Sequence, residues 1–183
     1  GDFLYVDANG DKKFDENDRQ ILNASPNPTS LFGLNLDASY KGIGIQVLLQ
    51  GQAGNKAYWR DGYLTTGVRN GYLINQAVAD NHWTPENPNA KYPRLTNYVY
   101  GQNTDPASDF WLQDASFLRV KNIQLSYNLP SRWVEKINMK RLMLYVNGEN
   151  LFTFTGYEGI DPEITKLGGT QTLYPTMKQI SFG

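Results

Sequence analysis

Residues 31–51 read LFGLNLDASYKGIGIQVLLQG, and side-chain polarity alternates with a period of two on both sides of a short link. Before the link, one parity carries Leu34, Leu36, Ala38 and Tyr40, and the other carries Gly33, Asn35, Asp37 and Ser39. After Lys41–Gly42, the apolar positions are Ile43, Ile45, Val47 and Leu49. This alternation predicts two strands with unlike faces, and a link of two residues predicts a tight antiparallel hairpin.

Three further stretches look like strands, at residues 116–129, 141–154 and from 174 onward. Within the first of them, Leu118 and Val120 share one parity, whereas Ile123 and Leu125 share the other. A β-bulge near Lys121–Asn122 would reconcile the two phases, because one extra residue moves the following side chains to the opposite face. We therefore expect an all-β fold of about five antiparallel strands.

The composition of the 183 residues excludes several classes of protein. There is no cysteine, so disulfide scaffolds and cysteine-ligated zinc sites are ruled out. The net charge of −1 offers no overall basic field for nucleic acid or anionic lipid, so partner choice depends on local chemistry. The single histidine, His82, is interpreted as a loop residue, and the carboxylates Glu158 and Asp161 as surface charges instead of a glycosidase pair. No enzymatic activity is expected.

The connections between the expected strands alternate between short and long. Their lengths are two residues, then about 60, about 11 and about 19, which is the order of periplasmic turns and extracellular loops in an outer-membrane barrel. The apolar runs of the first hairpin extend over about 9 residues, near the length that a tilted strand needs to cross a bilayer. A soluble domain with one solvated sheet face would show the same alternation along each strand.

The strongest chemical motif is DANGDKKFDEND at residues 7–18. A hard cation such as Ca²⁺ takes six to eight oxygen ligands, and a tight loop can supply them from alternate residues. The expected ligands are the side chains of Asp7, Asn9, Asp11, Asp15 and Asp18, with the main-chain carbonyl of Lys13. The motif departs from the EF-hand pattern because Lys12 replaces glycine at the sixth position and the shorter Asp18 stands at the twelfth. A solvated acidic turn is the alternative.

Aromatic residues are frequent between residues 51 and 111. Exposed amphipathic rings there could stack on sugar rings or contact a partner protein, so the candidate binding residues are Tyr58, Trp59, Trp83 and Trp111. The alternative is structural, because aromatic residues also form girdles at membrane interfaces and anchor long loops to a barrel wall.

Two blocks, DASFLRVKNIQLSYNLP at 114–130 and LYVNGENLFTFTGYEGIDPE at 144–163, carry a resemblance to a known family. With YVDANGDKKFDENDRQIL at 5–22, they make the chain similar to the C-terminal part of a SusC/RagA-type TonB-dependent outer-membrane transporter. The resemblance implies a barrel of about 22 strands with an N-terminal plug, of which this chain would supply roughly the last five strands. Because Gly1 is not an initiator methionine and the chain stops at SFG directly after a strand-like run, both ends of the chain are expected to be cut.

The resemblance also implies a function and partners. A parent of this family would sit in the outer membrane of a Gram-negative cell, in contact with lipid, and would import oligosaccharides or peptides. It would act with a SusD-like surface lipoprotein and with TonB. Residues 1–29 would then form a calcium-loop-like extracellular segment and its connection. Residues 30–183 would form the partial barrel, with a long extracellular loop at 51–110.

A soluble, secreted, calcium-stabilised module that binds carbohydrate is the second interpretation. The two interpretations differ in what covers the face that carries Ile43, Ile45, Val47 and Leu49. That face would meet lipid in a transporter and a second sheet in a soluble module.

Overall fold

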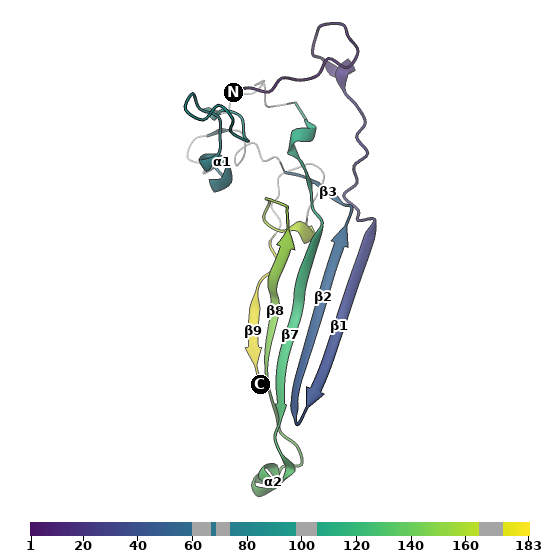
Figure 1. The fold of residues 1–183 in the computed structure, drawn as a ribbon, viewed down its shortest axis with the longest axis vertical. Helices are drawn as coiled ribbons and strands as arrows, with labels where there is room; N and C mark the ends of the chain where they lie inside the picture. Colours follow the sequence, from purple (N-terminus) through teal and green to yellow (C-terminus); the bar gives the residue numbers. More distant parts are fainter. Residues whose placement is uncertain (60–66, 69–73, 98–105, 165–173) are drawn as a thin grey trace. The chain divides into compact units, whose positions relative to one another are not determined.

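The computed structural model describes residues 1–59, 67–68, 74–97, 106–164 and 174–183. Its main element is a five-stranded antiparallel sheet with the strand order β1-β2-β7-β8-β9, seen along its length in Figure 1. The strands are β1 (Ser30–Tyr40), β2 (Ile43–Ala53), β7 (Phe117–Asn128), β8 (Met143–Thr155) and β9 (Gln179–Phe182). The expected all-β antiparallel fold is confirmed.

The hairpin between β1 and β2 turns at Lys41 and Gly42, as the two-residue link predicts. Both residues have positive φ, +47° for Lys41 and +88° for Gly42, as in the two-residue turns that match the twist of antiparallel strands. A Cβ at Gly42 would lie 2.8 Å from the carbonyl oxygen of Asn128, so glycine also permits the close approach of β7. This closeness brings the Asn128 amide within 2.8 Å of the Gly42 carbonyl, where it donates a hydrogen bond.

The predicted β-bulge is present in β7. Leu48 pairs with Asn122 and Leu49 pairs with Val120, so Lys121 has no partner in β2. The same point breaks the register with β8, where Val120 faces Phe152 and Asn122 faces Glu149. The extra residue explains the change of apolar parity along β7, because it returns the side chains before and after it to one face.

The remaining elements are short. They are η1 (Glu16–Asp18), β3 (Lys56–Tyr58), β4 (Gly67–Val68), α1 (Gln76–Asp80), β5 (Thr96–Asn97), η2 (Asp109–Trp111), β6 (Leu112–Asp114), α2 (Ser131–Val134), η3 (Glu135–Ile137) and η4 (Pro162–Ile164). β3 pairs with β6, and β4 pairs with β5 in parallel. None of the helices in the described part of the chain could span a bilayer.

The chain divides into two compact units that interleave along the sequence. The sheet unit contains residues 25–57, 114–165 and 173–183, and the loop unit contains residues 1–24, 58–113 and 166–172. The predicted long loop at 51–110 therefore supplies much of the loop unit, and part of it lies outside the described residues.

An aromatic core holds the loop unit together. Trp59, Tyr92 and Trp111 are all buried, and their ring centroids lie 6.0–6.5 Å apart. Val78 of α1 is also fully buried in this unit. Rings at such separations bury a large apolar area in few residues, which suits a unit with little regular secondary structure.

Candidate functional site

The sheet presents one continuous apolar face. In antiparallel strands, residues that pair directly carry their side chains on the same face. One row across the sheet is Leu36, Val47, Ile123, Gly148 and Ile180, and its neighbour is Ala38, Ile45, Leu125, Val146 and Phe182. We call the side that carries these rows the apolar face. Most of its large side chains are exposed, Ile45 by 42% and Phe154 by 61%, so no second layer among the described residues covers it.

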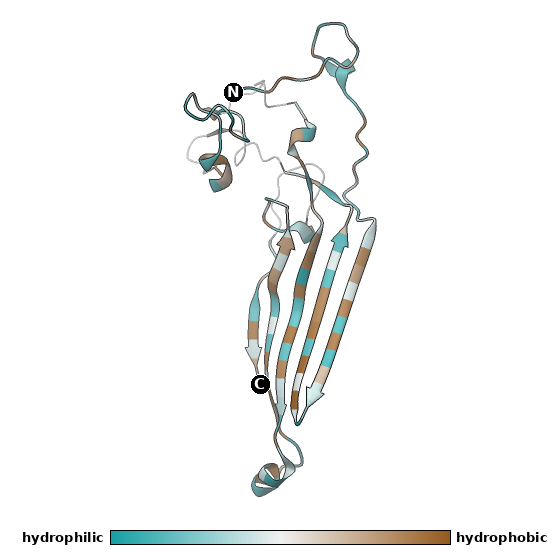
Figure 2. Cartoon of the chain, in the orientation of Figure 1, coloured by the Kyte–Doolittle hydropathy of each residue, from teal (hydrophilic) through white to brown (hydrophobic). Residues whose placement is uncertain are grey.

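The opposite side of the same strands, the polar face, is rich in amide and hydroxyl groups. One row reads Asp37, Gln46, Gln124, Asn147 and Ser181 across all five strands, and the next reads Asn35, Leu48, Asn122, Glu149 and Gln179. Figure 2 shows the resulting alternation of hydrophobic and hydrophilic residues along each strand. The sheet therefore has one apolar face and one polar face. A soluble sandwich also needs only one apolar face on each sheet, but it covers that face with a second sheet.

A buried ion-pair cluster lies on the polar face. Arg119 of β7 belongs to the polar row with Gln50 and Thr153, and its Nε donates to Thr153 Oγ1 at 2.9 Å. Its guanidinium also binds Asp161 Oδ1 at 2.7 Å and the carboxylate of Glu163. These contacts hold the connection that follows β8 against the polar face. We call Arg119, Lys121, Asp161 and Glu163 the Arg119 cluster.

The bulge at Lys121 completes the Arg119 cluster. Lys121 Nζ lies 2.9 Å from Glu163 Oε1 and 3.0 Å from Oε2, so one carboxylate receives two cations. The main-chain amides of Glu163 and Thr176 donate to the two oxygens of Asp161 at 3.0 and 2.8 Å. Every charge in the cluster therefore has an opposite charge or a hydrogen-bond donor beside it, which is the condition for burying charged groups at tolerable cost.

Asp161 is not a surface charge, contrary to the expectation from sequence. Its side chain is 3% exposed, and that of Arg119 is 4% exposed. Burial opposes ionisation of this carboxyl, but the amides of Glu163 and Thr176 and the Arg119 guanidinium outweigh it, so the pKa of Asp161 lies below its ordinary value. The sequence contains one signal for this cluster, because Arg119 stands among polar positions of a strand. It does not indicate the partners of Arg119, which lie more than 40 residues further on.

The acidic loop at residues 7–18 is folded through its own main-chain amides. Asp7 accepts from the amides of Gly10 and Lys12 at 2.6 and 2.7 Å, and Asp11 accepts from that of Lys13 at 2.8 Å. Asp18 accepts from the amides of Ala8 and Asp15, both at 2.8 Å. Hydrogen bonds from these amides, that of Asp15 foremost, outweigh desolvation and lower the pKa of Asp18.

The donor chemistry of this loop suits a hard cation, because carboxylate oxygens keep further lone pairs after accepting one hydrogen bond. Asn9 Oδ1 accepts from the Asp11 amide, and Asp15 Oδ1 accepts from the Asn17 amide. Across the described ranges, no three acidic or histidine side chains converge on a point that could hold a metal ion in this arrangement.

The four candidate binding aromatics occupy different environments. Trp59 and Trp111 are buried in the core of the loop unit, and Trp83 is half-buried. Tyr58 lines a cavity of about 750 Å³ in the same unit, and its hydroxyl accepts from the Ser108 amide at 3.3 Å. The structure does not bring these four rings together on one exposed surface.

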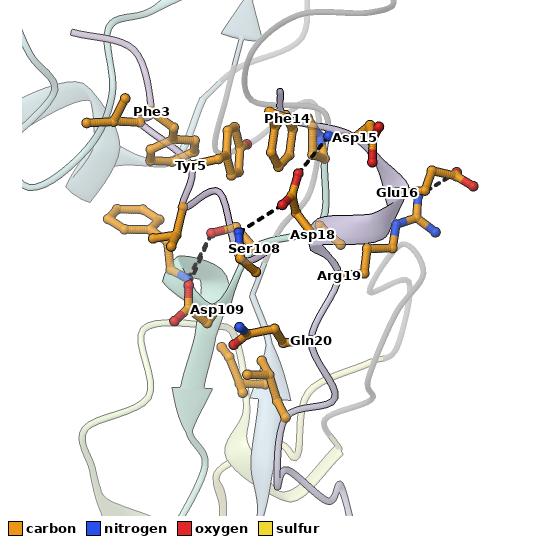
Figure 3. Close-up of a pocket in the computed structure, with 18 of the residues that line it drawn as sticks. Phe3, Tyr5, Phe14, Asp15, Glu16, Asp18, Arg19, Gln20, Ser108 and Asp109 are labelled. Atoms are coloured by element: carbon orange, nitrogen blue, oxygen red, sulfur yellow. Dashed lines mark hydrogen bonds and ion pairs between the residues drawn. The ribbon is translucent and has the colours of Figure 1, made fainter. Parts of the chain in front are cut away.

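The cavity beside Tyr58 lies between the N-terminal segment and residues 106–112, both of which line it (Figure 3). Its aromatic lining includes Phe3, Tyr5, Phe14 and Phe110, and the rings of Tyr5 and Phe14 stack at 4.3 Å. Acidic side chains of Asp15, Glu16 and Asp109 border it. The sequence does not predict that Phe3, Tyr5 and Phe14 line a cavity, because nothing in the local pattern indicates which distant segment they contact.

Comparison with known proteins identifies the relatives of this chain. No protein-family model matches it. A TonB-dependent receptor of Formosa agariphila is 34% identical over 175 residues, which cover 92% of this chain and 17% of the relative. SusC of Bacteroides thetaiotaomicron, also a TonB-dependent receptor, is 27% identical over 176 residues, 94% of this chain and 16% of the relative. The relatives are TonB-dependent receptors.

Solved structures agree with this relationship. The RagAB peptide transporter matches with a TM-score of 0.70 and 26% identity, over 92% of this chain and 18% of that chain. The same importer in its closed-closed state matches with a TM-score of 0.70 and 29% identity over the same shares. The expected resemblance to SusC/RagA-type TonB-dependent receptors is confirmed. These names are those of receptors and transporters, not of enzymes, and the chain spans less than a fifth of the length of each.

Proposed function

We propose that this chain forms part of the barrel wall of a TonB-dependent transporter in the outer membrane of a Gram-negative cell. The observation that carries the proposal is the two-faced sheet, with an exposed apolar face backed by a polar face over strands of 11–13 residues. Strands of that length cross a bilayer when tilted. In such a wall, lipid covers the apolar face and the polar face lines the lumen.

The exposed apolar face favours this proposal over a soluble carbohydrate-binding module. A sandwich would cover Ile43 and Ile45 with a second sheet, but both side chains are exposed by more than 40%. Soluble monomers rarely leave an apolar patch of this extent in water. Lipid would remove the free-energy cost of exposing this apolar face to water.

The proposed cargo is an oligosaccharide or a peptide, taken up together with a SusD-like surface lipoprotein and driven by TonB. Support comes from the names of the relatives, which include SusC, and of the solved neighbours, described as a peptide transporter and a peptide importer. The polar face adds a physical reason, because its neutral amides and hydroxyls can hydrogen-bond to sugar hydroxyls or peptide groups without selecting for charge.

We also propose that residues 7–18 bind Ca²⁺ and that the ion braces an extracellular loop. The side chains of Asp7, Asn9, Asp11, Asp15 and Asp18, with the Lys13 carbonyl, would supply oxygen ligands. The tight turns at Gly10 and Lys12, with φ of +81° and +63°, already bend the loop back toward Asp7. Binding would bring the carboxylates closer together and replace their mutual repulsion with attraction to the ion.

Cell fractionation tests the transporter proposal. An antibody raised against residues 7–20 should detect a protein roughly five to six times the length of this chain, since the relatives exceed it by about that factor. That protein should be in the outer-membrane fraction. A soluble protein of about the size of this chain would contradict the proposal and leave the carbohydrate-binding module as the function to test.

A further inference from the structure

One end of the five-stranded sheet carries a concentration of positive charge. At this end lie the β1–β2 turn at residues 41–42 and the β7–β8 connection at residues 129–142, and the hydrogen bond from the Asn128 amide to the Gly42 carbonyl joins them. We call these two segments the basic end. Its cations are Lys41, Arg132, Lys136, Lys140 and Arg141, and its single anion is Glu135. The whole chain has a net charge of −1, so this positive charge is local.

Most of these cations make no ion pair with a carboxylate in the part of the chain that the structure describes. Arg141 donates to Asn128 Oδ1 at 3.0 Å, and Lys41 Nζ lies 5.1 Å from the centroid of the Tyr40 ring. Within the described residues, no ion pair joins Arg132, Lys136 or Lys140 to a carboxylate, and all three are exposed. Three exposed cations in one short connection repel one another unless anions neutralise them.

Apolar side chains stand out beside the cations. Trp133 is 53% exposed, Ile137 56% and Met139 49%, although α2 and η3 together comprise only seven residues. Val134, by contrast, is buried and fixes the helical turn. An exposed tryptophan among lysines and arginines has the composition of a membrane interface, where the indole lies at the level of the headgroups.

The basic end is continuous with the apolar face. Tyr40, Ile43, Tyr127 and Leu144 pair in register as the last row of that face before the two connections. Tyr40 and Tyr127 are both exposed, so a pair of tyrosines separates the aliphatic part of the face from the cations. Membrane proteins show the same order from the acyl chains to the headgroups: apolar residues come first, then aromatic residues, then cations.

We propose that the basic end binds the phosphate groups of anionic phospholipids at the membrane surface. The inference rests on the proposed function, because it places the apolar face in lipid. Short connections of outer-membrane barrels lie on the periplasmic side, so the lipid would belong to the inner leaflet. Arg132, Lys136 and Lys140 meet the headgroups, while Trp133 and Ile137 insert between them.

Lipid retention by the full-length transporter tests this inference. The protein is placed in nanodiscs of phosphatidylcholine mixed with phosphatidylglycerol, and the bound lipid is measured by native mass spectrometry. The wild type should retain phosphatidylglycerol above its share in the mixture. The R132Q/K136Q/K140Q variant should retain it more than about tenfold less, since loss of one surface cation alone lowers the binding of anionic lipid several-fold.

The matched control removes the same charge elsewhere. The R19Q/K91Q/K178Q variant loses three exposed cations outside the basic end and should retain phosphatidylglycerol like the wild type. Folding of each variant is checked by its heat-dependent mobility in gels. If the triple variant at the basic end does not fold, K136Q alone should still lower retention several-fold.

The other outcomes separate the two proposals. Equal retention by the wild type and a folded basic-end variant would overturn the inference alone. Displacement of the lipid by millimolar inorganic phosphate would also overturn it, since the site would then bind free phosphate. If the wild type does not enter nanodiscs, the proposed function fails and this inference with it.

Discussion

Arg119 and Asp161 form a buried ion pair, with 2.7 Å between Nη2 and Oδ1, across 42 residues of sequence. The pair joins the middle of the sheet to the connection that follows β8. Because Arg119 lies on the polar face, the connection folds over that face and away from Phe154 of the apolar face. In a barrel wall, the Arg119 cluster would hold this connection on the lumen side.

Replacing Arg119 by methionine should destabilise the protein by about 3–5 kcal/mol, because it leaves the buried carboxylate of Asp161 without its cation. The measurement is the free energy of unfolding of the full-length protein in detergent. Arg119→Lys should recover only part of the loss, since Thr153, Glu163 and Asp161 are bound by three separate nitrogens of the planar guanidinium, whose spread a single ammonium nitrogen does not reproduce.

The control for that change is Arg19→Met, which breaks the exposed pair with Glu16 at 3.0 Å. Exposed pairs contribute about 0–1 kcal/mol, so this variant should unfold like the wild type. Equal effects of the two methionine variants would show that the Arg119 cluster is not buried in the protein.

Asp114 should give stability that disappears in acid. Hydrogen bonds from Ser116, and secondarily Lys56, lower its pKa from 3.8 to about 2. A carboxyl group whose pKa is lower in the folded state than in the unfolded state stabilises the protein fully at a pH above the unfolded-state pKa. This contribution is lost as the pH falls through the folded-state pKa. The difference in unfolding midpoint between wild type and Asp114→Asn should therefore be constant at neutral pH and shrink between pH 3.8 and about 2. A difference that stays constant down to that pH would contradict the assignment.

The two faces of β2 should respond oppositely to a charge. Val47→Lys places an ammonium on the apolar face and should cost about 2–4 kcal/mol in a membrane. Gln46→Lys places the same charge one residue away on the polar face and should cost far less. Folding yield into lipid vesicles and the free energy of unfolding there measure both. Similar costs at the two positions would contradict the assignment of the faces.

Calcium should raise the unfolding temperature of the parent protein, and Asp7→Asn with Asp11→Asn should abolish the rise. The physical reason is the loss of two anionic oxygen donors from residues 7–18. Calorimetric titration with CaCl₂ measures binding directly. Asp37→Asn, which removes a carboxylate from β1, is the control and should bind like the wild type. Unchanged binding by the Asp7/Asp11 variant would place any calcium elsewhere.

Much of the sheet could be predicted from the sequence because its determinants are local. The alternation of residues 31–51 sets both faces of the first hairpin, and Gly42 sets its turn. The change of parity along β7 located the bulge at Lys121. Each of these features depends on neighbours within one strand or one turn, which a periodic pattern reports.

The contacts that depend on distant segments could not be predicted. The burial of Asp161 requires Arg119, and the burial of Trp111 requires Trp59 and Tyr92, which lie on separate segments. An acidic residue in a polar loop has the same local pattern whether it is solvated or paired. For that reason the sequence predicts a surface position for Asp161 and makes Trp59 and Trp111 candidate binding residues.

The most direct test of the transporter assignment is the accessibility of spin labels placed singly at residues 43–49 of the full-length protein in lipid vesicles. The 183 residues contain no cysteine, so once any cysteine elsewhere in the full-length protein is replaced by serine, each label position is introduced by one substitution. Labels at residues 43, 45, 47 and 49 should collide with dissolved oxygen from the lipid, and those at 44, 46 and 48 with a water-soluble nickel chelate. Equal access of the nickel chelate at every position, or protection of the odd positions from both reagents, would contradict the assignment of this sheet to a membrane wall.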